Sequence, residues 1–443
     1  MKFAYGIGVV LCLIFAPLVA HADVIAIENV YVFDSREATR SSQPQVVLVQ
    51  GSRILDVVSE IPDNISPSRI VNGKGGTLIP GLIDAHWHAA LAAPSQIDAL
   101  TADPGYLHVL AANLAKTTVL RGFTTVRDMG GPTFGLRRAI EQGITPGPRI
   151  FPSGAMISQT GGHGDFRLPH EVPRGSTTPL SHTELQGAAA IADGEAEVLR
   201  RAREQLMLGA TQIKLMAGGG VSSLYDPLDV TQYTHDELTA AVAAAENWGT
   251  YVTVHAYTSR AIQIAIGAGV KSIEHGQLVN EETVQLMAER DIWWSLQPFL
   301  DDENANPKTG LARQKQLQVA QGTDTAYALA RQYGVKVAFG TDVLFSGGNA
   351  ESQMPRLLSM QRWFTPAEVL QMATYNNGQL LQLSGPRYPY PGPLGLIEAG
   401  AMADLIIVRG NPLEDLNLLL NPEANFQVIM KNGVIYQTLE SAQ

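Results

Sequence analysis

The chain has 443 residues, of which 45% are hydrophobic and 16% are charged, and its formal net charge at pH 7 is −11. This composition is typical of a globular protein with a buried core, and the negative charge argues against a polyanionic partner such as nucleic acid. The only cysteine, Cys12, excludes a disulfide framework. These properties favour a protein that acts on a small molecule.

The first residues are typical of an export signal. Lys2 is followed by an apolar stretch over residues 3–19 and then by Ala-His-Ala at 20–22, an A-x-A cleavage pattern that would make Asp23 the new N-terminus. The stretch could instead be a retained membrane anchor, although it is shorter than the roughly 20 residues that a span requires. We expect residues 1–22 to be removed, so that the mature chain is periplasmic or secreted and holds no membrane segment.

Both ends of the mature chain have the character of short strands. Residues 23–77 carry β-type segments such as 46–49, interrupted by glycine and proline, and residues 386–443 repeat this pattern at 405–408 and 426–429. Hairpin-rich segments of this kind need partners to bury their apolar faces. We expect the two ends to pair into one small β-sandwich domain.

The segment between them, residues 78–385, alternates β-like runs with amphipathic helices. One helix has apolar residues at helical spacing over 198–206 and should end at Gly209. Repeated strand-helix units over this length predict an α/β fold, a parallel TIM-like (β/α)8 barrel. The strands are expected at residues 78–86, 124–128, 149–151, 212–216, 251–255, 272–275, 293–297 and 335–341.

Two histidines stand at the end of the first barrel strand, in LIPGLIDAHWHAAL at residues 78–91. Because side chains alternate along a strand, His86 and His88 face the same way and Trp87 faces the opposite way. Functional side chains of parallel barrels lie at the C-terminal strand ends. The pair could therefore supply two ligands of a metal site. Two loop histidines that bind nothing would show the same sequence pattern.

Three other strands end in possible metal ligands. His255 ends YVTVHAY, His275 ends KSIEHG, and Asp342 follows KVAFGT. Each alone would more often be a structural residue. Together with the His-x-His pair they indicate one convergent site, and neutral imidazoles with a carboxylate suit zinc or a similar divalent ion.

Other residues near the expected barrel mouth are candidates for contact with a substrate. Tyr257 lies two positions after His255 and would share its face, where its hydroxyl could donate to a developing oxyanion. His163 lies between glycines in TGGHGD, which let backbone approach a ligand closely. Either could equally be a loop residue satisfied by solvent or backbone. Lys214, alone among apolar neighbours in TQIKLMAGGG, could simply extend its ammonium to the barrel mouth.

Two stretches have structural interpretations. Arg127 and Asp128, at the end of the second barrel strand, are expected to form a buried ion pair. Gly218-Gly219-Gly220 lacks the Lys-Ser/Thr that follows a phosphate-binding loop, so we expect close packing beside Lys214 and no bound nucleotide.

The motifs GLIDAHWH, IKLMAGGGV, VHAY, IEHG, FGTD and GAMADLIIV occur in an order that resembles the amidohydrolase superfamily over nearly the whole mature chain. GPRIFPSGAMISQTGGHGD and AGGGVSS are similar to its metal-dependent Xaa-Pro dipeptidases, the prolidase-like carboxypeptidases that include ochratoxin-hydrolysing amidohydrolases, more than to imidazolonepropionases. The resemblance implies a homo-oligomeric enzyme with two divalent metal ions, zinc being the first expectation.

The resemblance also implies a role for each site residue. It implies that His86, His88 and Asp342 hold one metal, that His255 and His275 hold the second, and that Lys214, carboxylated to N6-carboxylysine, bridges them. Without carboxylation a mononuclear site would remain. Asp342 would take a proton from the attacking hydroxide and pass it to the leaving amine. Tyr257 and His163 would help to hold the substrate.

The leading hypothesis is therefore a binuclear hydrolase that cleaves an amide bond to a C-terminal amino acid, as in Xaa-Pro dipeptides or N-acyl amino acids such as ochratoxin. An imidazolonepropionase-like hydrolysis of a cyclic amide, or a deamination, could use the same site. An exported metal-dependent binding protein is the alternative of another class. Asp342 favours an enzyme, because binding alone needs no proton shuttle beside the metal.

Overall fold

The computed structural model describes residues 23–173, 178–347 and 350–438. The export signal expected at residues 1–22 lies outside them and stays a prediction. Within the described ranges, no helix combines the length and apolarity that a membrane span needs.

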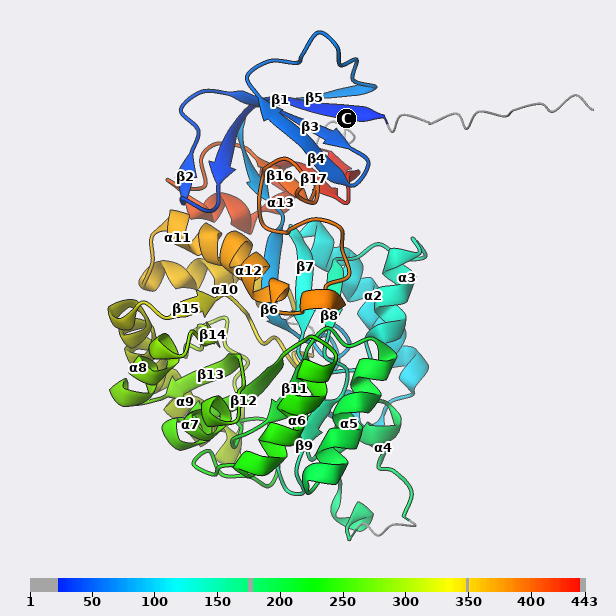
Figure 1. Cartoon of the computed structure of the whole chain (residues 1–443), viewed down its shortest axis with the longest axis vertical. Helices are drawn as coiled ribbons and strands as arrows, with labels where there is room; N and C mark the ends of the chain where they lie inside the picture. The colour runs from blue at the N-terminus through cyan, green and yellow to red at the C-terminus, as the bar shows by residue number, and fades with distance from the viewer. Residues whose placement is uncertain (1–22, 174–177, 348–349, 439–443) are drawn as a thin grey trace, which may run out of the picture.

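Strands from both ends of the chain form one β domain, as expected (Figure 1). Its hydrogen-bonded order is β18-β17-β16-β5-β1-β3-β4, with β2 paired to β1. The antiparallel pair β5–β16 joins the N-terminal part of the sheet to the C-terminal part. Apolar side chains from both parts, including Ile27, Val47 and Leu405, share one buried cluster. The strands are β1 (Val24–Asp34), β2 (Thr39–Arg40), β3 (Gln45–Gln50), β4 (Arg53–Val58), β5 (Arg69–Pro80), β16 (Leu405–Val408), β17 (Phe426–Lys431) and β18 (Val434–Thr438).

The central part of the chain forms the predicted (β/α)8 barrel from two parallel sheets, β6-β7-β8 and β10-β9-β11-β12-β13-β14-β15. Two contacts close the ring: Ala85 N donates to Phe339 O at 2.9 Å, and Thr211 N donates to Pro152 O at 2.8 Å. The strands are β6 (Leu82–Trp87), β7 (Phe123–Asp128), β8 (Arg149–Pro152), β9 (Met156–Ser158), β10 (Ala189–Ile191), β11 (Ile213–Met216), β12 (Val252–Thr258), β13 (Ser272–Leu278), β14 (Trp293–Ser295) and β15 (Lys336–Ala338).

The first barrel strand begins later than predicted. Residues 78–80 end β5 and pair with β16 in the small sheet, and β6 starts only at Leu82. Gly81 lies at the junction, where an added Cβ would stand 2.1 Å from Thr124 Oγ1. Because the apolar run is unbroken on both sides of this glycine, hydrophobicity alone did not reveal the change of sheet. The short strands β9 and β10 were also not predicted.

Helices cover the outside of the barrel. The helix expected over 198–206 is confirmed as α5, which ends where Gly209 adopts a φ of +102°. The helices are α1 (Gln96–Thr101), α2 (Pro104–Leu120), α3 (Phe134–Glu141), α4 (His182–Leu185), α5 (Glu195–Leu208), α6 (His235–Asn247), α7 (Ser259–Gly267), α8 (Glu281–Glu289), α9 (Gly310–Tyr333), α10 (Gln353–Ser359), α11 (Pro366–Gln371), α12 (Asn377–Gln382) and α13 (Pro422–Asn425). Single turns and a π-helical turn are η1 (Pro169–Glu171), η2 (Ala350–Ser352), η3 (Met360–Arg362), η4 (Met372–Asn376), η5 (Gly385–Arg387) and η6 (Leu416–Leu420).

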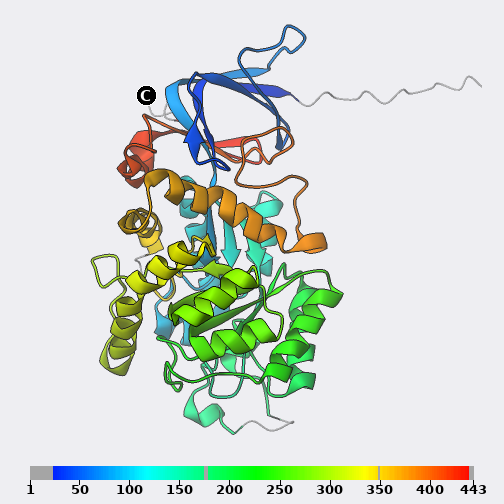
Figure 2. The same cartoon turned by 60° about the vertical axis from the view of Figure 1, so that its left-hand side comes forward.

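The small sheet adjoins the N-terminal ends of the barrel strands. Arg149, at the start of β8, donates to both carboxylate oxygens of Asp404 at 2.8 and 3.1 Å, and Gly81 N donates to Asp404 O at 2.8 Å. Figure 2 shows α11 and α12, in orange, between the small sheet and the barrel. The C-terminal strand ends therefore lie away from this junction, where a ligand can approach them.

Candidate active site

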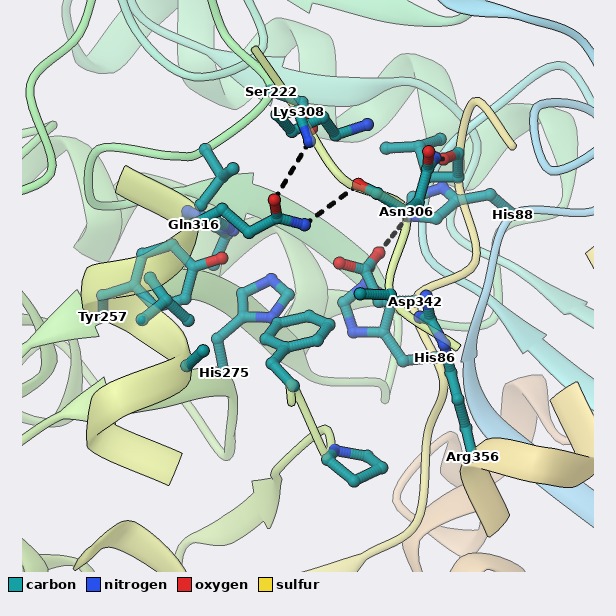
Figure 3. Close-up of a pocket in the computed structure, with 18 of the residues that line it drawn as sticks. His86, His88, Ser222, Tyr257, His275, Asn306, Lys308, Gln316, Asp342 and Arg356 are labelled. Carbon is teal, nitrogen blue, oxygen red and sulfur yellow. Dashed lines mark hydrogen bonds and ion pairs between the residues drawn. The ribbon is translucent and has the colours of Figure 1, made fainter. Parts of the chain in front are cut away.

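One pocket at the C-terminal ends of the barrel strands collects the predicted site residues (Figure 3). They lie in strands β6, β11, β12 and β13 or in the loops that follow β6, β9 and β15, so residues far apart in the sequence meet there. The residues are His86, His88, His163, Lys214, His255, Tyr257, His275 and Asp342.

His86 and His88 both point at Asp342. Their Nε2 atoms each lie 3.2 Å from Asp342 Oδ1, while Trp87 is buried in an apolar cluster on the other side of the strand. Asp342 N donates to His86 O at 2.7 Å, which fixes the two strand ends together. Burial alone would raise the pKa of Asp342, but His86 and His88 hold it well below its usual value. Asp342 is therefore a carboxylate.

Three imidazoles are oriented by hydrogen bonds through Nδ1, so that Nε2 is the nitrogen that each could offer to a metal. Each acceptor is buried and comes from a neighbouring part of the barrel. The Nδ1 contacts are His86 to Glu274 Oε2 at 2.8 Å, His88 to Gly130 O at 2.9 Å and His275 to Gln297 Oε1 at 2.8 Å.

His255 is oriented in the opposite sense. Its Nε2 lies 3.0 Å from Gly219 O, which leaves Nδ1 as the free nitrogen. The His255 ring is 4.4 Å from that of His275, and the His275 ring is 4.9 Å from that of His86. Burial holds the pKa of His255 and of His275 well below the usual value, so both rings are neutral. Neutral imidazoles have the lone pair that a metal requires.

The ligand atoms come close enough to share an ion. One nitrogen of His86, one nitrogen of His275 and one oxygen of Asp342 all lie within 4.8 Å of one another. His275 and Asp342 have φ of +77° and +50°, a left-handed conformation that costs non-glycine residues on the order of 1–3 kcal/mol and is concentrated at functional sites. Imidazole and carboxylate donors in this arrangement fit a divalent ion such as zinc.

Lys214 lies fully buried on β11 beside these ligands. Burial lowers its pKa to about 8, against the opposing effect of Glu274 and Asp342. A fraction of the amine is therefore neutral and nucleophilic near neutral pH.

A second group of buried polar residues lies beneath the ligands. Arg127 Nη2 donates to Glu274 Oε1 at 2.6 Å, and the ion pair expected between Arg127 and Asp128 is not formed. Asp128 instead accepts the backbone N–H of Ala89 at 2.6 Å and that of Gly130 at 3.3 Å. Adjacent residues of a strand face opposite ways, which explains the correction.

His163 and Tyr257 contact the two histidines of the later strands. The His163 ring stacks on His255 at 4.0 Å, and its Nδ1 lies 2.9 Å from Ser223 Oγ. Strand β12 continues past the predicted end, so Tyr257 faces the pocket 5.1 Å from the ring of His275. Burial holds the pKa of Tyr257 well above its usual value, so its hydroxyl keeps its proton.

The glycine run packs closely, as expected, although its neighbours differ. A Cβ on Gly220 would lie 1.8 Å from His163 Nδ1, and one on Gly219 would lie 1.8 Å from Pro227 O. The run therefore makes room for His163 and for the loop at Pro227.

Sequence reasoning missed the residues that orient the ligands and those that form the outer pocket. Glu274 precedes His275 in the same motif and could have been noticed as a charged residue inside an apolar strand. Gln297 and Ser223 carry no comparable signal. The outer pocket is lined by Phe166 and Met216, which share one apolar cluster, by Phe299 and Val319, which share another, and by the segment that contains Lys308.

Comparisons with known proteins extend over most of the chain. Residues 77–440 match the model of the amidohydrolase family. An ochratoxinase of Aspergillus niger is 32% identical over 388 residues, which cover 86% of this chain and 79% of that protein. A prolidase solved in complex with N-methylphosphonate-L-proline has a TM-score of 0.84 at 33% identity, covering 94% of this chain and 100% of its own. A Xaa-Pro dipeptidase with bound methionine in the active site has a TM-score of 0.79 at 28% identity, covering 94% and 100%.

Proposed function

Because this chain belongs to the amidohydrolase family, within the branch of prolidases and ochratoxinase, and is a hydrolytic enzyme, we propose that it cleaves an amide bond to a C-terminal amino acid. The substrates would be Xaa-Pro dipeptides or N-acyl amino acids of the ochratoxin type. The observation that carries the proposal is the convergence of the Nε2 atoms of His86 and His88 on Asp342 Oδ1, each at 3.2 Å, beside two neutral imidazoles.

The donor set supports a site for two divalent ions. His86, His88 and Asp342 would hold one ion, and His255 and His275 the other. Lys214 would bridge them as a carbamate, in which its neutral amine forms an N–C bond with carbon dioxide and releases a proton. The lowered pKa of Lys214, about 8, supports this step because only the neutral amine reacts. Zinc is the first candidate, since imidazole and carboxylate are its usual ligands.

Bound divalent ions would make water acidic enough to supply a nucleophile near neutral pH and would polarise the amide carbonyl. Asp342, ionised in the pocket, would accept a proton from the attacking water and pass it to the leaving nitrogen, which becomes an amine as the C–N bond breaks. The hydroxyl of Tyr257 donates to the carbonyl oxygen as negative charge develops there. His163 presents Nε2 to the substrate, because Ser223 occupies its Nδ1.

Two other proposals concern the location of the enzyme and its assembly. Export of the mature chain and its assembly into a homo-oligomer both stay predictions. The comparisons indicate a hydrolytic enzyme, so we do not retain the alternative of a metal-dependent binding protein.

The function is tested with purified protein and a panel of Xaa-Pro dipeptides, N-acetyl amino acids and ochratoxin A. We expect release of the C-terminal amino acid, loss of activity after dialysis against a chelator, and recovery when zinc is restored. Metal analysis should find two ions per chain in the wild type and fewer in Lys214→Ala. If fully metal-loaded protein hydrolysed no amide or ester on the panel, the proposed function would be wrong.

A further inference from the structure

Two cationic side chains line the pocket outside the predicted ligand set, and they are placed differently. Arg356 is committed to backbone: its Nη1 donates to Thr341 O at 2.6 Å and its Nη2 to Asn304 O at 3.3 Å. It braces the end of β15 against the segment before α9. The other cation is Lys308, which lies in that same segment.

The backbone of Lys308 is held firmly at the pocket edge. Its N–H donates to Gln316 Oε1 at 3.0 Å, and Gln316 Nε2 donates to Asn306 O at 2.9 Å. Asn306 Nδ2 in turn donates to Phe345 O at 3.2 Å. Figure 3 shows Lys308, Asn306 and Gln316 linked in this way beside Asp342. The backbone position from which the Lys308 side chain extends is therefore fixed.

The ammonium of Lys308 has no hydrogen-bond or ion-pair partner among the residues that the structure describes. Asp302, the acidic residue of the same segment that lines the pocket, is exposed and accepts the N–H of Asn304 at 2.9 Å. Lys308 itself is half-buried, and burial lowers its pKa although Asp342 opposes this. A cation that has lost part of its hydration without gaining a counter-charge favours an anionic ligand.

We propose that Lys308 binds the α-carboxylate of the amino acid that leaves, and so makes the enzyme select substrates with a free C-terminus. The inference rests on the proposed function, in which this carboxylate lies two bonds from the scissile nitrogen. Other pocket groups cannot serve as well: Arg356 is committed to backbone, and Lys214 is buried beside the metal ligands. An uncharged carboxamide in the same place would leave Lys308 without a counter-charge.

The kinetic test compares the fastest N-acetyl amino acid of the panel with its C-terminal carboxamide. Lys308→Met keeps the length of the stem and removes the charge. We expect it to raise KM for the carboxylate by about 10- to 100-fold, the range for a charge-assisted hydrogen bond, with little change in kcat and none for the carboxamide. Lys308→Arg should restore most of the affinity. Lys116→Met, an exposed lysine on α2, is the matched control for loss of one charge.

A binding measurement separates this inference from the proposed function. Calorimetry with the metal-loaded protein compares 3-phenylpropionate with 3-phenylpropionamide, neither of which has a bond to cleave. We expect the wild type to bind the carboxylate more tightly and Lys308→Met to lose that preference. If the variant kept the full preference, or the wild type had none, the inference would be overturned, even where hydrolysis of the panel upheld the proposed function. If no panel compound were cleaved, the function would fail and calorimetry would still decide on Lys308.

Discussion

The barrel contains two clusters of buried polar residues, and strand β13 contributes to both. The lower cluster centres on Glu274, which accepts hydrogen bonds from Arg127 at 2.6 Å and from Ser272 at 3.1 Å. The upper cluster contains His275, the next residue along the strand, with the other predicted metal ligands. The φ of +77° at His275 interrupts the alternation of side chains, so both residues contact His86.

The two clusters differ in how donors and acceptors are matched. In the lower cluster each strong donor meets an acceptor: Arg127 also donates to Ala85 O at 2.6 Å and to Tyr251 at 3.1 Å. In the upper cluster, the neutral imidazoles of His255 and His275 converge with the ionised Asp342, whose Oδ1 lies 3.2 Å from Nε2 of His86 and of His88. A matched cluster can stabilise the fold by itself, whereas converging lone pairs need a cation. We therefore expect the first cluster to stabilise the fold and propose that the second holds metal ions.

The largest expected effect concerns the upper cluster. Asp342→Asn keeps the shape of the side chain and removes its ability to accept a proton, so we expect kcat to fall by about 1,000-fold. The measurement is turnover at saturating zinc, with metal content determined in parallel. Asp302→Asn, at the pocket edge, removes a carboxylate that we do not place in the mechanism and should leave kcat nearly unchanged. Equal losses in both variants would contradict the role of Asp342.

The next effect concerns the lower cluster and should appear in stability. Arg127→Met leaves Glu274 as a buried charge without its main partner, which should lower the free energy of unfolding by about 3–5 kcal/mol. Denaturant unfolding measures the change. Arg200→Met removes an exposed pair with Glu197 and should cost no more than about 1 kcal/mol. If the two variants were equally stable, the lower cluster would not be structural.

The loss of stability in Arg127→Met should depend on pH. In the wild type, burial would raise the pKa of Glu274, but Arg127 and His86 hold it well below its usual value. Its stabilising contribution is therefore present above that usual value and is lost as the pH falls through the lowered pKa. Without Arg127, burial should raise the pKa instead. The deficit of Arg127→Met should then shrink as pH falls from about 8 to about 5, because protonated Glu274 needs no counter-charge.

The comparison also shows what sequence could predict. The barrel followed from apolar runs, and the candidate ligands followed from their positions at strand ends, because both patterns are local. Their roles as ligands stay proposals. Glu274, Gln297 and Lys308 were missed because their importance depends on which distant residue they meet. Lys308 in particular lies in a polar segment, and in sequence nothing distinguishes it from a solvated lysine. Hydrogen bonds from Lys308 N to Gln316 and from Asn306 to Phe345 position this segment.

The smallest expected effect tests a residue at the border of the upper cluster. Ser223 Oγ accepts from His163 Nδ1 at 2.9 Å and donates to Gly220 O at 3.2 Å, so it fixes which nitrogen of His163 is left for a ligand in the pocket. Ser223→Ala removes one hydrogen bond worth about 1 kcal/mol, which predicts a rise in KM of about fivefold at unchanged metal content.

Ser222→Ala is the matched control for this change. Ser222 is the neighbouring serine, it also lines the pocket, and we assign it no role in orienting His163. If Ser223→Ala lost zinc, Ser223 would belong to the support of the metal ligands. If KM did not change, His163 would need no fixed orientation. We expect KM to change while the metal content stays the same. That result would mean that Ser223 orients a substrate contact and that other residues orient the metal ligands.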